Sequence, residues 1–197
     1  MRDKLLELLN YNEEFRKRVG QSYFDKIQGI QTPWLTLVAC CDSRIHTNIM
    51  MDDATNEVFE IRVIGNVIEN ALGSVDYGVY QLRTPMLFIM GHSDCGAIKG
   101  SLDDRGKLQE SIENTLEPIR KNTKIDAGKK LSNYVIDNIE NQVEYALNRY
   151  KTLVESGELV IVGGYYDFDN SCSEGCGKIV LVNYNGDPVY KNSYEIL

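Results

Sequence analysis

Two short segments contain residue types that bind metal ions and handle protons. The first is Cys40-Cys41-Asp42-Ser43-Arg44, and the second is His92-Ser93-Asp94-Cys95-Gly96-Ala97. Cysteine thiolates and a neutral imidazole are good zinc ligands. A His-x-x-Cys pair at a turn from strand to helix can place both side chains on one ion, and Cys40 can complete the set. We therefore predict that Cys40, His92 and Cys95 bind zinc and leave a fourth tetrahedral position for water, as in catalytic zinc sites.

Charged residues beside the first cysteine predict how such a site would handle its water. Two thiolates cancel the double charge of zinc, so the ion should acidify its water less than an ion held by three histidines would. Asp42 can accept the proton of a zinc-bound water or hydroxide, and Arg44 can hold that carboxylate in a bidentate pair. The same pair would keep Asp42 off the metal and leave the site open. Backbone N–H groups at the start of a helix near Gly96 would favour a developing anion.

Short apolar segments alternate with amphipathic ones along the chain. This pattern predicts five strands, at residues 35–39, 57–63, 85–90, 159–166 and 178–184, the last two joined as a hairpin. It favours an α/β fold with a mainly parallel central sheet of four strands plus an antiparallel edge strand, flanked by helices. Ligands of such sheets bind beyond the carboxyl ends of the strands. Cys40 and His92 both follow a predicted strand, so we expect them to share one crevice.

Helical periodicity is clearest near the middle of the second half of the chain. Residues 132–155 carry apolar side chains at three- and four-residue steps, and Gly157 supplies a stop signal. Further helices are expected over residues 3–19 and 107–121 and from Cys95 onward. Asn66 and Ser74 are predicted to cap two more.

The overall composition is that of a globular protein, and its charge disfavours nucleic acid or a membrane surface as the main partner. The 197 residues include 21 Lys and Arg against 29 Asp and Glu, a formal net charge of −8. This acidity disfavours binding to nucleic-acid phosphates or to an anionic membrane surface. Apolar runs fall short of the roughly 20 residues of a membrane-spanning helix, and the first residues lack the apolar region of a signal peptide. We therefore expect a cytoplasmic protein.

The remaining cysteines and the second histidine leave several interpretations open. Five cysteines are an odd number, which favours metal binding or catalysis over a disulfide framework. Cys41 is expected to pack as a small hydrophobic residue. Cys172 and Cys176 can be free thiols, a second metal site or a disulfide. His46 is expected at the surface, with a proton shuttle as the alternative.

The two chemical segments together resemble the β-class carbonic anhydrases. That family has Cys-x-Asp-Ser-Arg, followed about fifty residues later by His-x-x-Cys-Gly-Ala. The resemblance extends over roughly residues 5 to 185. It also includes Asn12–Phe15, Val58-Phe59, Arg62, Gly65-Asn66, Gly73–Tyr77 and Gly163–Asp167. It implies a single domain of this type over residues 1–197, with residues 1–33 as a helical N-terminal arm.

The resemblance also implies an activity and a cofactor. The family is a zinc lyase, carbonate dehydratase, with one Zn²⁺ per chain held here by Cys40, His92 and Cys95 and assisted by an Asp42–Arg44 dyad. The reaction is the reversible hydration of CO2 to bicarbonate and a proton by zinc-hydroxide attack. The expected partners are CO2, bicarbonate and further copies of the chain in a homodimer or higher homo-oligomer.

Departures from the family pattern keep two alternatives open. The segment Arg62-Val63-Ile64-Gly65-Asn66 stands where the family commonly has Arg-Asn-Ala-Gly-Asn. A carbon disulfide or carbonyl sulfide hydrolase on the same scaffold is therefore the nearest alternative. Leu37 stands where the bicarbonate-inhibited subset has Trp, which favours the open site. A zinc-binding or redox-sensing module that uses Cys172 and Cys176 is the alternative from another class.

Overall fold

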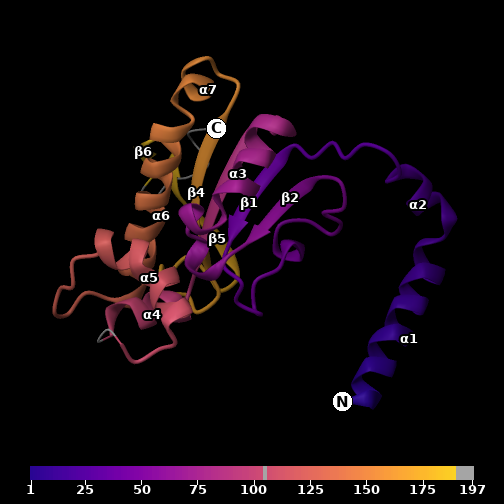
Figure 1. Cartoon of the computed structure of the whole chain (residues 1–197), viewed down its shortest axis with the longest axis horizontal. Helices are drawn as coiled ribbons and strands as arrows, with labels where there is room; N and C mark the ends of the chain where they lie inside the picture. The colour runs from indigo at the N-terminus through magenta and orange to yellow at the C-terminus, as the bar shows by residue number, and fades with distance from the viewer. Residues whose placement is uncertain (104–105, 190–197) are drawn as a thin grey trace. The chain divides into compact units, whose positions relative to one another are not determined.

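The computed structural model describes residues 1–103 and 106–189. The chain divides into two compact units, the first of which is Met1–Thr32 and the second of which begins at Pro33. The first unit contains helices α1 (Arg2–Val19) and α2 (Gln21–Lys26), and the second contains the sheet (Figure 1). The organisation of residues 1–197 as one domain with an arm stays a prediction.

The second unit is built on a mixed sheet. Its described strands lie in the order β2-β1-β3-β4-β5-β6. Their bounds are β1 Leu35–Ala39, β2 Val58–Arg62, β3 Met86–His92, β4 Val160–Asp167, β5 Lys178–Tyr184 and β6 Asp187–Pro188. The first four pair in parallel, and β5 and β6 are antiparallel. The predicted fold class is confirmed, and the two-residue strand β6 is an addition to it.

Both faces of the sheet are covered, which explains why its central strands are mostly apolar. All five residues of β1 are buried. Their side chains alternate between two clusters, so that Val38 joins one while Leu37 and Ala39 join the other. A strand buried on both faces fixes its register firmly, because a shift by one residue would exchange the two sets. This register determines where the residues that follow β1 lie.

The helices of the second unit differ from the sequence prediction in three places. The described helices of this unit are η1 Thr47–Ile49, η2 Ile64–Asn66, η3 Ile68–Ala71, α3 Leu72–Asp76, η4 Tyr77–Gln81, α4 Gly96–Leu102, α5 Glu110–Asn122, α6 Leu131–Arg149 and α7 Lys151–Glu155. The predicted caps are wrong, because Asn66 has a φ of 49° at the end of η2 and Ser74 lies inside α3. The predicted helix 132–155 is broken at Tyr150, whose buried phenol donates to Asp76 Oδ1 over 2.9 Å.

Helix α6 lies against the centre of the sheet, alongside β4 (Figure 1). Two glycines on neighbouring strands allow this close approach. A Cβ added to Gly91 would lie 2.8 Å from Ile139 Cδ1, and one added to Gly163 would lie 2.8 Å from Ile139 Cγ2. Gly91 directly precedes His92, so the same packing that seats α6 also fixes the end of β3.

We expect Gly91→Ala to lower the free energy of unfolding by about 1–3 kcal/mol, because the added methyl overpacks the contact with α6. Urea unfolding followed by circular dichroism measures this change. Gly73→Ala is the matched control, because a Cβ there meets no atom within 4 Å. Equal stability of Gly91→Ala and the parent chain would contradict this account of the packing.

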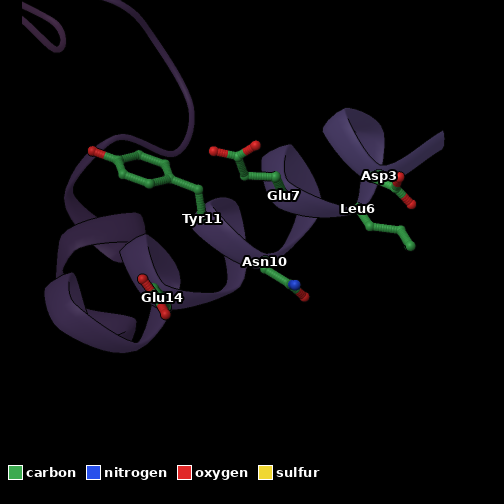
Figure 2. A pocket seen from close by; sticks show the side chains of 6 residues that line it. All are labelled: Asp3, Leu6, Glu7, Asn10, Tyr11 and Glu14. Atoms are coloured by element: carbon green, nitrogen blue, oxygen red, sulfur yellow. The ribbon is translucent and has the colours of Figure 1, made fainter. Parts of the chain in front are cut away.

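Helix α1 buries none of its residues. Its leucines at positions 5, 6, 8 and 9 are exposed. A groove of about 430 Å³ runs along the helix, and Figure 2 shows that α1 alone provides the side chains lining it: Asp3, Leu6, Glu7, Asn10, Tyr11 and Glu14. None of these is a predicted site residue. Among the residues that the structure describes, every helix is too short or too polar to cross a membrane.

Candidate metal centre

Adjacent parallel strands deliver the three predicted metal ligands to one place. Cys40 directly follows β1, and His92 is the last residue of β3. These strands pair in a register that sets Ala39 opposite Met90, so their carboxyl ends meet at one edge of the sheet. Cys95 follows three residues after His92 and immediately precedes α4.

Cys40, His92 and Cys95 form a compact, buried group of metal-ligating side chains. One ligand atom from each lies within 4.8 Å of the ligand atoms of the other two. Tetrahedral zinc with bonds of about 2.0–2.3 Å sets its ligand atoms roughly 3.5–4 Å apart. This is the one group of its kind among residues 1–103 and 106–189. Its three side chains therefore fit a zinc ion with little rearrangement.

The hydrogen bonding of His92 leaves one ring nitrogen available to a metal. Nδ1 lies 2.8 Å from the carbonyl oxygen of Ser93, which can only accept, so Nδ1 carries the hydrogen and donates it. Nε2 is buried and has no hydrogen-bond partner. A buried polar atom without a partner is costly and uncommon. The lone pair of Nε2 is thus directed into the group, as a metal ligand requires.

The two thiols of the group hydrogen-bond to each other. This contact lowers the pKa of Cys40, against the opposing effect of burial. The same hydrogen bond raises the pKa of Cys95, and burial raises it too. The pair therefore keeps one proton, on Cys95, that a bound dication would displace.

Asp42 and Arg44 form a bidentate pair beside this group. Arg44 Nε donates to Asp42 Oδ1 over 2.8 Å, and Nη2 donates to Oδ2 over 2.7 Å. The backbone N–H of Arg44 also donates to Oδ1 over 3.0 Å. These hydrogen bonds hold the pKa of the Asp42 carboxyl well below its usual range. Asp42 is therefore a carboxylate at neutral pH, with both oxygens tied to one guanidinium.

Comparison with known proteins decides the family. The family model described as carbonic anhydrase matches residues 35–173, which is more than half of the chain. The chain belongs to the β-class carbonic anhydrases. A carbonic anhydrase of Mycolicibacterium smegmatis is 29% identical over 168 residues, covering 80% of this chain and 78% of that protein. Carbonic anhydrase 2 of Mycobacterium tuberculosis is 26% identical over the same shares.

Solved structures of this family show the same fold. A tetrameric β-carbonic anhydrase of the ascomycete Sordaria macrospora superposes with a TM-score of 0.75 at 22% identity, over 92% of this chain and 96% of that one. A Coccomyxa β-carbonic anhydrase in complex with acetazolamide gives a TM-score of 0.74 at 24% identity, over 92% and 86%. These identities are low, so the match concerns the architecture.

Arg62 fixes the backbone around Cys40, the first predicted metal ligand of this carbonic anhydrase fold. Its Nε donates to the carbonyl oxygen of Cys40 and its Nη2 to that of Asp42, each over 2.7 Å. Arg62 ends β2 and pairs in register with Ala39 at the end of β1. The sequence analysis noted Arg62 but gave it no role. Its position at the end of a predicted strand was the available signal.

Three further residues near the site were missed by the sequence analysis. Asp94 accepts two hydrogen bonds, at Oδ2 from Arg44 Nη1 over 3.1 Å and at Oδ1 from Lys99 Nζ. Asp167, at the end of β4, is fully buried and accepts from Ser93 Oγ over 3.2 Å. Phe168, the next residue, packs beside His92 and Arg44. Asp94 lies in the second chemical segment and Asp167 ends the segment Gly163–Asp167, but neither was given a role, because their partners depend on the folded loops.

Other predicted residues lie outside this group. Cys41 is exposed, so its predicted packing is wrong, because the chain leaves β1 at Ala39 and strand alternation no longer applies. His46 is exposed, as a surface histidine would be. Gly96 begins α4, and its predicted backbone role stays a prediction.

Cys172 and Cys176 are both free thiols. Cys172 is half-buried, and its backbone N–H donates to Asp167 Oδ2 over 2.8 Å. Burial and then the neighbouring Asp167 carboxylate raise the pKa of the Cys172 thiol to about 11. A thiol that stays protonated at neutral pH is a poor nucleophile. This environment is unlike that of a redox-sensing cysteine.

We expect Cys172 to react slowly with iodoacetamide in the folded protein. At pH 8 its raised pKa leaves a thiolate fraction about a hundredfold below that of an ordinary cysteine. The rate should rise about tenfold per pH unit, because the reactive thiolate forms as pH approaches the raised pKa. Peptide mapping between pH 7.5 and 9.5 measures the rate at Cys172, with urea-unfolded protein as the control. Equal rates in folded and unfolded protein would instead favour the redox-sensing alternative.

Proposed function

We propose that this chain catalyses the reversible hydration of CO2 to bicarbonate and a proton, with one Zn²⁺ held by Cys40, His92 and Cys95. The observation that carries the proposal is the buried Cys40–His92–Cys95 group, with its unpartnered His92 Nε2, beside the Asp42–Arg44 pair. Membership of the carbonic anhydrase family supports the same reaction.

The ligand set suits zinc by its chemistry. Two sulfur donors and one imidazole favour Zn²⁺ over the hard cations, which prefer oxygen ligands. A three-residue set leaves one coordination position for the reactants. When bound, zinc would act as a Lewis acid that lowers the pKa of a water molecule. The chain's own contribution is to hold the ligands in place and to manage the proton.

Asp42 has one oxygen with capacity left for a reactant. Its Oδ1 accepts from both the backbone N–H and Nε of Arg44, whereas Oδ2 accepts from Nη2 alone. Each carboxylate oxygen has about two lone-pair sites. Asp42 Oδ2 is therefore the atom that can accept a hydrogen bond from the reacting water and orient it toward CO2. Because Arg44 keeps Asp42 ionised, this acceptor is present throughout the neutral range.

Arg44 has a second role in the proposed mechanism. An unpaired carboxylate beside a zinc site can itself become a metal ligand. With both Asp42 oxygens bonded to the guanidinium, binding of Asp42 to the metal would require breaking those charge-assisted hydrogen bonds. Arg44 thus keeps the reactant position open. The backbone N–H of Gly96 is the proposed donor to bicarbonate.

We further propose that the working form is a homodimer or a higher homo-oligomer. The Sordaria macrospora relative is described as tetrameric. In this chain, α1 leaves its leucines exposed. Burial of apolar area is the main favourable term in most protein association. A second copy of the chain that covers these leucines would supply such burial. A cytoplasmic location belongs to the same proposal.

Cys40→Ser should bind much less than one zinc per chain, because a serine hydroxyl is a far poorer ligand than a thiolate. Elemental analysis after dialysis against a weak chelator measures the zinc content. Cys176→Ser is the control, because that exposed cysteine lies outside the ligand group. Full zinc occupancy in Cys40→Ser would remove Cys40 from the ligand set.

Zinc-loaded protein should hydrate CO2 in stopped-flow assays, and Asp42→Asn should reduce kcat by about 10²- to 10⁴-fold with zinc retained, because the anionic hydrogen-bond acceptor that orients the reacting water is lost. Asp137→Asn serves as the control, since Asp137 lies on α6 and pairs with Lys129 just before that helix. Sulfide release from carbonyl sulfide or carbon disulfide without CO2 hydration would contradict the proposal and support the alternative of a hydrolase for these sulfur substrates. Loss of zinc from Asp42→Asn would instead make Asp42 a metal ligand.

A further inference from the structure

Phe168 contacts two residues of the proposed site, one at the end of β3 and one in the loop that follows β1. Its ring lies nearly parallel to the imidazole of His92, with centroids 6.1 Å apart and an interplanar angle of 28°. The guanidinium carbon of Arg44 lies 4.8 Å from the centroid of the Phe168 ring. The ring of Tyr166 meets Phe168 edge-on at 5.8 Å, which limits its rotation. Phe168 thus joins a proposed zinc ligand to the Asp42–Arg44 pair.

The guanidinium of Arg44 is held at its edge by acidic residues and at its face by Phe168. Asp42 and Asp94 accept its N–H groups. The Arg44 side chain is nevertheless 46% exposed. Hydrogen bonds of so exposed a guanidinium compete with water and are weaker than buried ones. An aromatic ring over the flat face attracts the cation and keeps water from that side.

A rigid loop presents Phe168 to the site. The backbone N–H of Phe168 donates to Ser93 Oγ over 3.1 Å, and Ser93 directly follows His92. The buried carboxylate of Asp167 accepts from the N–H groups of Ser171 and Cys172, over 3.0 Å and 2.8 Å. The start of the loop is therefore hydrogen-bonded both to Ser93, which follows β3, and to the later part of the same loop at Ser171 and Cys172. The backbone of Phe168 is thus anchored to the residue that directly follows His92.

We propose that Phe168 is a positioning residue that holds the guanidinium of Arg44 in the orientation that keeps Asp42 paired. The proposal rests on the function given above, because it assigns Phe168 to that reaction. Phe168 acts through Arg44 and not on the substrate. Its aromatic face is the property that matters, since leucine has a similar size but no ring quadrupole to attract the cation.

The first test compares variants of Phe168 in the zinc-loaded full chain. Phe168→Leu should lower kcat/KM for CO2 by about tenfold with zinc content unchanged, which is the effect of losing a partly desolvated cation–π contact. Phe168→Tyr should restore most of the rate, because it keeps the aromatic face. Phe59→Leu is the control, since Phe59 lies against Tyr77 instead. Equal losses in Phe168→Leu and Phe168→Tyr, or no loss in Phe168→Leu, would overturn the proposal.

A double-variant cycle separates positioning from general packing. Arg44→Lys removes the flat bidentate group through which Phe168 acts. In this background Phe168→Leu should have little further effect on kcat/KM, because residues that act as a unit are not additive. If Phe168→Leu costs the same factor in both backgrounds, Phe168 does not act through Arg44.

A readout without turnover keeps the test independent of the proposed reaction. The Nε–Hε signal of Arg44 in a ¹⁵N spectrum can be assigned by its loss in Arg44→Lys. Ring-current shielding by Phe168 should displace this signal upfield, and Phe168→Leu should return it toward the shift of a free arginine. Phe168→Tyr should keep the displacement. An unchanged signal in Phe168→Leu would overturn the contact itself. Failure of the parent protein to hydrate CO2 would reject the proposed function, while this spectrum would still decide the role of Phe168.

Discussion

The parallel pairing of β1 with β3 is the constraint on which the proposed site depends. It places the carboxyl ends of two buried strands side by side, so that Cys40 and the His92–Cys95 segment meet. The register is firm because both faces of β1 are covered by apolar clusters. The glycines that admit α6 secure the end of β3 from one face. Core packing and ligand geometry are therefore two results of the same strand pairing.

Around this fixed group, arginines organise the charged residues. Arg62 binds the carbonyl oxygens of Cys40 and Asp42, and so shapes the loop that follows β1. Arg44 holds the side chains of Asp42 and Asp94, and Phe168 covers its face. Each arginine is matched by oxygen acceptors, which offsets the cost of placing charges beside a buried group. The result is a carboxylate that stays ionised and whose Oδ2 accepts only one hydrogen bond from Arg44.

The strands and the ligand group could be predicted because their signals are local. Residues 35–39 are apolar except for Thr36, and cysteine and histidine at the strand ends indicate metal binding. Features that depend on tertiary contacts could not. Tyr150, at the break between α6 and α7, hydrogen-bonds Asp76, which lies 74 residues earlier. The place of Phe168 depends on a loop organised by the buried Asp167, and neither residue belongs to a chemical motif.

A crystal structure of the zinc-loaded protein would test the central claim most directly, because it shows what each Asp42 oxygen binds. The account predicts one zinc ion bonded to Cys40, His92 and Cys95, with both oxygens of Asp42 still paired to Arg44 and outside bonding distance of the metal. An Asp42 oxygen about 2.0–2.2 Å from zinc, with Arg44 displaced, would contradict it.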